Sequence, residues 1–225
     1  RTALARSKNM VSIRVLQSIG PAFGQEWVQR FGFDADKHPA YLTMALGAGS
    51  VTPLQMASAY SVFANGGYLT APMLIAKVTD SKGHMLSQGA PSRLDEASRA
   101  IDARNAFVMN SLLQEVTRSG TAASAKRALG RGDIYGKTGT TNDSMDAWFA
   151  GYNPSMVAVV WIGYDTPKKL GDRETGGGLA LPVWIELMQH ALKNVPVQEP
   201  APPEGVVNIG GLWMFDEFGH GRGVS

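Results

Sequence analysis

Apolar side chains recur at intervals of three and four residues in several stretches of the chain, which is the pattern of amphipathic helices. One stretch stops at Gly20-Pro21. Another begins at Thr52-Pro53-Leu54-Gln55, where a threonine cap, a first-turn proline and a following glutamine favour a helix start, and it is expected to end at Asn65-Gly66-Gly67. The predicted helices cover residues 11–19, 27–31, 53–64, 101–116 and 182–192, with a further short helix that Thr121 is expected to cap.

Strand-like runs follow one another closely in the second half of the chain. Three strands are predicted, over residues 134–140, 147–152 and 157–164. Their short connections favour antiparallel neighbours over parallel crossovers. An earlier pair of runs flanks Asp80-Ser81-Lys82-Gly83 and predicts a surface hairpin. The sequence therefore predicts an α/β fold of the α+β kind, an antiparallel sheet flanked by helices, with the helix at 182–192 lying on the sheet.

Three further features receive structural interpretations. Trp148, Phe149 and Trp161 sit on predicted strands and are interpreted as core residues. The run Gly176-Gly177-Gly178 precedes the last predicted helix and is interpreted as a flexible loop rather than a phosphate cradle. Residues 195–205 are rich in proline and are expected to be extended.

Composition excludes several classes of function. The formal net charge is only +2 and no dense run of Lys or Arg occurs, so nucleic acid is not a predicted partner. The chain has no cysteine, which leaves no disulfide framework and no thiol chemistry. The four histidines are scattered without ligand spacing, so neither a metal site nor another cofactor is predicted; they are His38, His84, His190 and His220. The longest strongly apolar run, Met156 to Ile162, is short for a membrane helix.

The sequence Lys137-Thr138-Gly139-Thr140 offers chemistry on a predicted strand. Alternation along a strand places Thr138 and Thr140 on one face, and Lys137 and Gly139 on the other. A glycine in a strand allows close approach of a ligand, and a neighbouring lysine can pair with a substrate carboxylate. A phosphate-binding loop is excluded, because position 131 is arginine where that motif requires glycine. The alternative is a surface strand that ends in a turn.

A single Ser-x-Asn occurs in the chain, as Ser7-Lys8-Asn9. The hydroxyl of Ser7 could relay a proton, and the amide of Asn9 could hold a substrate carbonyl or amide. The alternative is an ordinary polar helix end. The sequence alone does not establish whether this segment meets Lys137 in space.

Taken together, these motifs carry a resemblance to a known family. Ser-x-Asn followed by Lys-Thr-Gly resembles two of the three signatures of penicillin-binding proteins and serine β-lactamases. The wider context resembles the class A penicillin-binding proteins, most of all their 1A type, from residue 1 to about residue 195. The segments that carry it are Ser7–Arg14, Leu46-Gly47, Thr52–Ala57, Phe63–Tyr68, Ser119–Ala122 and Gly136–Tyr152.

The resemblance implies a peptidoglycan DD-transpeptidase with the penicillin-binding protein/serine β-lactamase-like fold. An active serine would attack a D-Ala-D-Ala stem peptide, expel the last D-Ala and pass the acyl group to an amine. Carried over by motif, Ser7 relays the proton to the leaving amine. Asn9 contacts the substrate amide and helps to hold the catalytic lysine, while Lys137 keeps Ser7 poised and attracts the substrate carboxylate. Lys8 fills a variable position with an expected surface role.

The remaining site residues follow from the same resemblance. Thr138 and Thr140 are expected to bind the substrate carboxylate through their hydroxyls, and the Thr140 N–H to complete an oxyanion hole. Gly139 is expected to keep the strand edge clear. The implied partners are peptidoglycan stem peptides, lipid II-derived glycan strands and β-lactam antibiotics.

One signature of the family is missing. None of the nine lysines has a serine three positions earlier, so the Ser-x-x-Lys that supplies the nucleophile does not occur. We expect that segment to lie upstream of Arg1, together with a glycosyltransferase domain and a membrane anchor at the periplasmic face of the bacterial inner membrane. The chain is thus interpreted as the C-terminal part of a transpeptidase domain (1–194), followed by a proline-rich extension (195–225). Alone, it is predicted to form no acyl-enzyme.

Two alternative functions are also compatible with the sequence. A DD-carboxypeptidase or β-lactamase of the same fold would use water in place of the acceptor amine. A non-catalytic binding domain would keep the groove without the chemistry, and a complete gene that lacks an upstream Ser-x-x-Lys would favour it.

Overall fold

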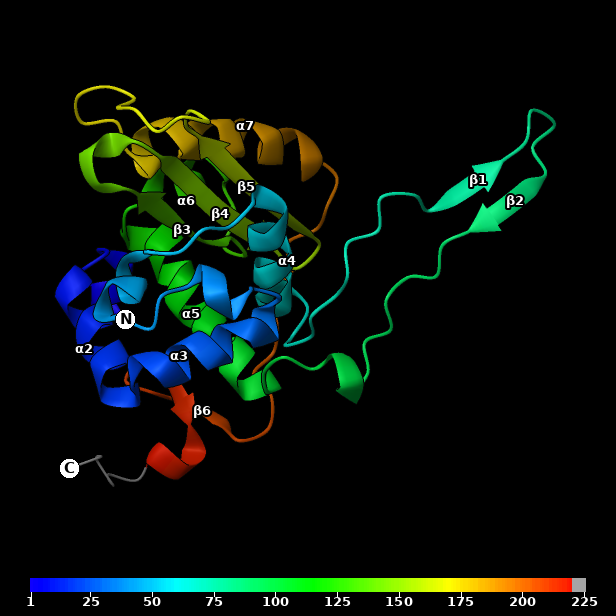
Figure 1. Ribbon diagram of the computed structural model, residues 1–225. Coiled ribbons are helices and arrows are strands. Elements are labelled where there is room, and N and C mark those ends of the chain that lie inside the picture. Colours follow the sequence, from blue (N-terminus) through cyan, green and yellow to red (C-terminus); the bar gives the residue numbers. More distant parts are fainter. Residues whose placement is uncertain (220–225) are drawn as a thin grey trace.

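A computed structural model describes residues 1–219 of the chain and shows a three-stranded antiparallel sheet between layers of helices (Figure 1). The strands lie in the order β3 (Tyr135–Thr140), β4 (Ala147–Asn153) and β5 (Met156–Ile162). This confirms the three predicted strands and their antiparallel pairing. Because β3 pairs only with β4, one of its edges is free of strand pairing.

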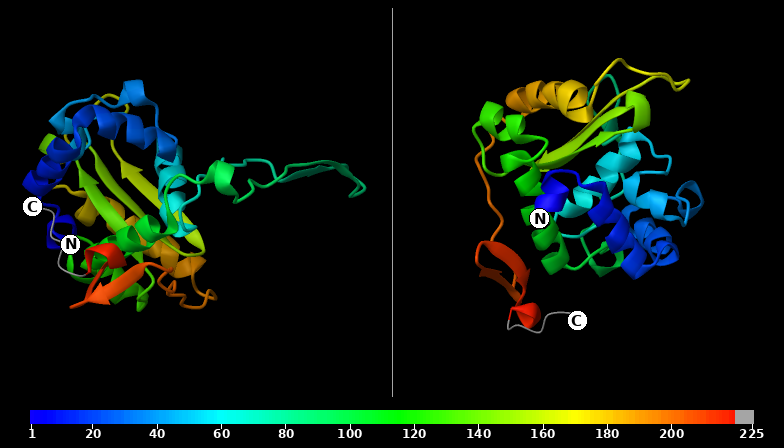
Figure 2. Two further views of the ribbon diagram at one scale, coloured as in Figure 1. Left: turned by 90° about the horizontal axis from the view of Figure 1, so that it is seen from below. Right: turned by 90° about the vertical axis from the view of Figure 1, so that its left-hand side faces the viewer.

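Helices cover both faces of this sheet. In Figure 1, α6 and α7 lie on one side of the strands, and α4 and α5 lie on the other, with α2 and α3 beyond them. Figure 2 shows the same layers from two further directions. The helices are α1 (Thr2–Ala5), α2 (Asn9–Ile19), α3 (Pro21–Val28), α4 (Pro53–Ala64), α5 (Ala103–Ser119), α6 (Ala123–Leu129) and α7 (Leu181–Ala191).

Local sequence signals explain where several helices begin and end. The hydroxyl of Thr52 accepts the N–H of Gln55, whose side-chain oxygen accepts the N–H of Thr52, so the predicted capping box starts α4. Helix α2 ends at Ile19, where Gly20 adopts a positive φ of 90°. The helix predicted over 27–31 begins earlier, because Pro21 occupies its first turn.

The two faces of the sheet bury different side chains. Facing α6 and α7, Phe149 lies edge-on to Trp184, with ring centroids 4.9 Å apart, and both are fully buried. On the opposite face, Tyr135 stacks on Tyr152 at 5.1 Å, and Tyr152 donates a hydrogen bond to Asn110 of α5. The sheet is therefore anchored by aromatic packing on both faces.

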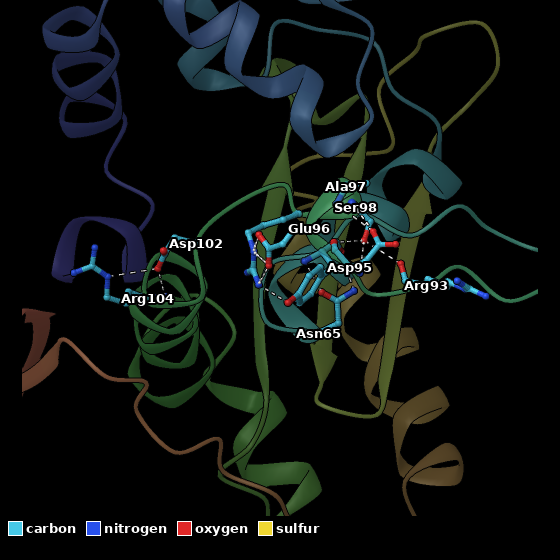
Figure 3. Close-up of polar contacts among 10 residues, drawn as sticks. Asn65, Arg93, Asp95, Glu96, Ala97, Ser98, Asp102 and Arg104 are labelled. Atoms are coloured by element: carbon cyan, nitrogen blue, oxygen red, sulfur yellow. Dashed lines mark hydrogen bonds and ion pairs between the residues drawn. The ribbon is translucent and has the colours of Figure 1, made fainter.

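A hairpin of β1 (Lys77–Thr79) and β2 (Met85–Gln88) projects away from the helices (Figure 1), as the sequence predicts. All seven strand residues are exposed. Polar contacts order the chain at the base of this arm (Figure 3): the Asp95 carboxylate accepts the N–H groups of Ala97 and Ser98, and the Ser98 hydroxyl donates to the Arg93 carbonyl.

A second hairpin near the C-terminus was not predicted. Strands β6 (Val206–Ile209) and β7 (Leu212–Phe215) are joined by Gly210-Gly211, both with positive φ. The hairpin packs on α5, where Trp213 meets Phe107 edge-on at 5.1 Å. A two-residue Gly-Gly connection between apolar residues was the signal that could have revealed it. Residues 195–205 contain no helix or strand, and His220 lies outside the described residues.

Short helical turns complete the chain. They are η1 (Gln29–Phe31), η2 (Ala35–Lys37), η3 (Leu42–Leu46), η4 (Glu96–Ser98), η5 (Asn142–Ser144), η6 (Gly176–Ala180) and η7 (Asp216–Phe218). Within residues 1–219, no helix is both long enough and apolar enough to traverse a bilayer.

Candidate active site

The fold brings the two sequence motifs together. The Nζ of Lys137 donates hydrogen bonds to the hydroxyl of Ser7 and to the Thr138 carbonyl, each at 2.9 Å. Ser7 lies in the turn between α1 and α2 with a positive φ of 51°, a conformation that non-glycine residues rarely adopt. The lysine on the edge strand and the serine near the start of the chain thus form one hydrogen-bonded pair.

Lys137 is only half-buried, but this burial changes the acid–base equilibrium of its side-chain ammonium. Burial lowers the pKa of the Lys137 ammonium below its ordinary value, because the charged form loses solvation. A lowered pKa makes the ammonium a stronger acid than that of an ordinary lysine, while its charged form still attracts a carboxylate. Both properties suit a group that holds a serine hydroxyl poised for proton transfer.

Asn9 begins α2, two positions after Ser7, and is exposed to solvent, as is Lys8. No hydrogen bond joins the Asn9 side chain to Ser7 or Lys137 among the contacts of residues 1–219. The structure therefore places Asn9 two residues from Ser7, at the exposed start of α2, without a side-chain hydrogen bond to either member of the pair.

The two threonines of the motif lie on the face of β3 opposite to Lys137 and Gly139, as the strand alternation predicts. The hydroxyl of Thr138 lies 2.7 Å from the hydroxyl of Thr121, in a hydrogen bond of either direction. The hydroxyl of Thr140 accepts the N–H of Gly176 at 3.0 Å. Each side chain is thus already oriented by a partner from another element.

The predicted capping role of Thr121 is wrong. Helix α6 begins at Ala123, with Ala122 at its cap position and no side-chain cap bond. The N–H of Thr121 instead donates to the carbonyl of Ala5 in α1, which holds the residue so that its hydroxyl faces β3. The sequence makes Thr121 a possible helix cap, but its hydrogen bond to Ala5 holds it in a different position.

The triple-glycine run is also not the flexible loop that we predicted. Gly176 is buried in η6, and a Cβ there would overlap the backbone oxygens of Gly139 and Trp148. The absence of a side chain lets this turn lie directly against β3 and β4. The close approach is what places the Gly176 N–H on the Thr140 hydroxyl.

A cleft of about 630 Å³ runs along β3. Residues 137–141 form one side and the segment 46–53 with α4 forms the other. At Gly139 a Cβ would lie 3.2 Å from the Cβ of Trp148, so glycine keeps that part of the cleft open. The cleft is lined by charged Lys137, Asp146 and Asp165, by hydroxyl groups, and by apolar Leu46, Val51, Met56, Tyr60, Trp148 and Trp161.

The interpretation of three aromatic residues as core holds for only one of them. Phe149 is fully buried, whereas Trp148 and Trp161 are only partly buried and line the cleft. Their rings lie 6.0 Å apart. Strand alternation was the signal that could have separated them, because neighbours such as Trp148 and Phe149 must face opposite sides of the sheet.

Comparison with known proteins identifies this arrangement. The profile described as "Penicillin binding protein transpeptidase domain" matches residues 1–189. The chain belongs to this family. Penicillin-binding protein 1A of Neisseria flavescens is 52% identical over 212 residues, which cover 94% of this chain and 26% of the relative. That of Pseudomonas aeruginosa is 40% identical over 255 residues, covering 93% of this chain and 31% of the relative.

Solved structures of the family agree with the fold. Penicillin-binding protein 1A from Haemophilus influenzae superimposes with a TM-score of 0.89 at 35% identity, over 94% of this chain and 37% of that one. PonA1 from Mycobacterium tuberculosis gives a TM-score of 0.72 at 26% identity, over 90% of this chain and 59% of that one. The resemblance to the 1A type and the fold class of a penicillin-binding transpeptidase are thereby confirmed. The chain spans roughly a quarter to a third of the length of these curated relatives.

Proposed function

We propose that the cleft along β3 is part of the active site of a peptidoglycan DD-transpeptidase. The observation that carries this proposal is the hydrogen bond from Lys137 to Ser7, because it assembles a proton-relay pair from two distant motifs. Membership of the transpeptidase family supports it independently.

In the proposed reaction, a serine oxygen attacks the carbonyl that joins the last two D-Ala residues of a stem peptide. The attacking serine gives up its hydroxyl proton, the C–N bond breaks, and Ser7 relays a proton to the leaving D-Ala. An acceptor amine then attacks the acyl-serine and loses a proton, which the same relay returns to the released serine oxygen. Lys137 holds the Ser7 hydroxyl throughout, and Asn9 contacts the amide of the substrate.

The substrate carboxylate is assigned to the end of β3. Thr138 and Thr140 present hydroxyls that Thr121 and the Gly176 N–H already orient. The positive charge of Lys137 attracts the same carboxylate from the other face of the strand, and Gly139 leaves the edge clear. The backbone N–H of Thr140 completes the oxyanion hole in this proposal.

The nucleophile is assigned to a segment outside these 225 residues. The chain contains no Ser-x-x-Lys, and it spans only 26% of the Neisseria flavescens relative. Alone, the chain would then form no acyl-enzyme. We extend the proposal to a glycosyltransferase domain and a membrane anchor in the same protein, at the periplasmic face of the bacterial inner membrane. Residues 1–194 would complete the transpeptidase domain, and residues 195–225 would form its extension.

The proposed partners follow from this reaction. Peptidoglycan stem peptides supply the acyl group and the acceptor, on glycan strands made from lipid II. β-Lactam antibiotics, which carry a carboxylate beside a strained amide, would acylate the same serine and remain attached.

A fluorescent penicillin tests the proposal. Residues 1–225 alone and the product of the complete gene are incubated with the probe, and intact mass and gel fluorescence are recorded. The proposal predicts a stable adduct on the complete protein, none on residues 1–225, and a greatly slowed adduct in Lys137→Met. Rapid turnover of the penicillin would favour a hydrolase, and a complete, folded protein without label would favour a non-catalytic groove.

A further inference from the structure

A second concave site, with a volume of about 570 Å³, lies at the base of the β1–β2 arm. One wall is the first part of α4, at Leu54, Gln55 and Ser58. The other walls are η1 and the two segments that lead into and out of the arm, residues 69–72 and 97–100. This arm-base pocket has the size of cavities that hold small organic ligands.

Helix α4 separates the arm-base pocket from the cleft along β3. Leu54 and Ser58 are four positions apart, so they share one face of the helix, and this face lines the pocket. Met56 and Tyr60 share the opposite face, which lines the cleft. Among residues 1–219, no side chain lines both cavities. A ligand in the pocket would therefore leave the cleft open to its own substrate.

Hydrogen bonds fix the walls that the arm contributes. The N–H of Leu69 donates to the carbonyl of Ser98 at 2.7 Å, which joins the segment that enters the arm to the segment that leaves it. The carboxylate of Asp95 accepts the N–H groups of Ala97 and Ser98 and so caps η4 (Figure 3). The pocket is thus shaped before a ligand enters, which lowers the entropic cost of binding.

Most of the side chains that line the arm-base pocket are apolar. The aliphatic ones are Leu54, Leu69, Ala71, Pro72, Ala97 and Ala100. A hydrocarbon group that enters the pocket leaves water and is stabilised by apolar burial. The lining therefore favours a ligand with an aliphatic part.

The charged groups of the pocket are of one sign, since two arginines and no acidic residue line it in the described part of the chain. Arg99 is already paired, because its guanidinium donates to the Glu96 carboxylate at 2.9 Å. Arg30 lies over the ring of Trp27, at 4.2 Å from the centroid, and donates to the carbonyl of Ala100 at 3.3 Å. Within residues 1–219, no carboxylate forms an ion pair with Arg30.

Arg30 therefore keeps several N–H donors for an anion at the edge of an apolar pocket. A guanidinium binds the two oxygens of a carboxylate side by side, and one such group balances a single negative charge. A phosphate monoester would bring up to twice that charge into a pocket with one unpaired cation. The charge and the lining together favour a carboxylate on an aliphatic chain.

We propose that the arm-base pocket binds a small amphiphile of the fatty-acid kind, with its carboxylate at Arg30 and its chain against Leu54 and Leu69. The transpeptidase reaction does not require this site, so the inference is independent of the proposed function.

A photoreactive octanoate that carries a diazirine on its chain tests the site on the complete protein. The protein is held in lipid nanodiscs, so that no detergent competes for the pocket, and it is irradiated with increasing concentrations of the probe. Labelled peptides are identified by mass. The matched probe is octanol with the same diazirine, which lacks only the carboxylate. We predict saturable labelling of residues 54–58, 69–72 or 97–100 by the octanoate, and half-maximal labelling by octanol only at higher concentration.

Arg30→Leu keeps an aliphatic side chain but removes the charge. It is expected to raise the octanoate concentration for half-maximal labelling about tenfold and to leave that of octanol unchanged. Arg93→Leu is the matched control, because Arg93 lies beside Ser98 (Figure 3) but does not line the pocket. Ala97→Phe, at an exposed position of the lining, is expected to fill the pocket and to abolish labelling by both probes. Thermal unfolding shows that each variant is folded.

The same half-maximal concentration of octanoate in the native protein and in Arg30→Leu would overturn the assignment of the carboxylate. Labelling that does not saturate, or that persists in folded Ala97→Phe, would overturn the pocket as the binding site. Excess benzylpenicillin should leave the labelling unchanged, because α4 separates the two cavities. Loss of the label under penicillin would place the probe in the cleft along β3 and would contradict the proposal, whereas a failure of penicillin to acylate the protein would affect the proposed function alone.

Discussion

The Nζ of Lys137 lies 2.9 Å from the hydroxyl of Ser7, although 130 positions separate the two residues in the sequence. This hydrogen bond joins the edge strand of the sheet to the turn that precedes α2. Because hydrogen bonds that involve a charged group are stronger than those between neutral groups, the contact fixes the serine as well as the lysine. The proposed proton relay depends on it.

Lys137 and Ser7 are expected to act as a unit during acylation. Lys137→Met is predicted to slow acylation by penicillin at least about hundredfold, and Ser7→Ala to slow it by a smaller factor, because each removes one member of the relay. The double variant should be little slower than Lys137→Met alone. A double-mutant cycle on acylation rate constants measures this coupling, and multiplicative effects would show that the two residues act independently.

The pH dependence of acylation should reveal the lowered pKa of Lys137. Burial moves this pKa below its ordinary value of 10.5. As pH rises through the lowered pKa, the ammonium loses its charge, and its attraction for the penicillin carboxylate is lost. The acylation rate constant is therefore predicted to fall on the alkaline side at a pH below 10.5.

Lys137→Arg is the control for this profile, because a guanidinium keeps its charge throughout the range. Lys137→Arg should be acylated more slowly than the native protein, because the guanidinium has a different geometry. Its acylation rate constant should not fall at alkaline pH. The same fall in both proteins would assign the titration to another group.

Thr121 is predicted to position the hydroxyl of Thr138. Replacing Thr121 with valine keeps the shape but removes the partner at 2.7 Å, and a typical hydrogen bond contributes about 1 kcal/mol. We expect Thr121→Val to slow acylation by roughly five- to tenfold and Thr121→Ser to restore the rate. A valine variant at the native rate together with a slowed serine variant would show that the methyl group, and not the hydroxyl, matters at this position.

Gly176 is predicted to be intolerant of a side chain. In Gly176→Ala the new Cβ would overlap backbone oxygens of β3 and β4, and relief of such overpacking costs about 1–3 kcal/mol. At Gly178 a Cβ would meet only the Thr175 hydroxyl, at 3.3 Å. Thermal unfolding should show a lower midpoint for Gly176→Ala than for Gly178→Ala, and equal midpoints would contradict the packing described for η6.

Local signals in the sequence account for much of the fold. The capping box at Thr52 and Gln55 predicts the start of α4, because both hydrogen bonds lie within four residues. Strand alternation predicts the opposite faces of Lys137 and Thr138 for the same reason. The hairpin at Gly210-Gly211 carries an equally local signal, a two-residue glycine turn between apolar residues.

The remaining features of the site depend on long-range packing and could not be predicted in this way. The partner of Thr138 is Thr121, from a turn whose backbone is held by Ala5 of another helix. The Thr140 hydroxyl meets Gly176 only because η6 folds back on the sheet. The position of Ser7 beside Lys137 likewise results from the packing of α1 against α5, which no pattern within either motif contains.

The most direct test of the account is acyl transfer between two peptides. The complete protein is incubated with a peptide that ends in D-Ala-D-Ala and with a second peptide that offers a free amine, and the products are identified by mass. The account predicts release of one D-Ala together with a joined peptide, both strongly reduced in Lys137→Met. Release of D-Ala with only the hydrolysed peptide would replace the transpeptidase with a carboxypeptidase, and no release at all would contradict the catalytic role of the cleft.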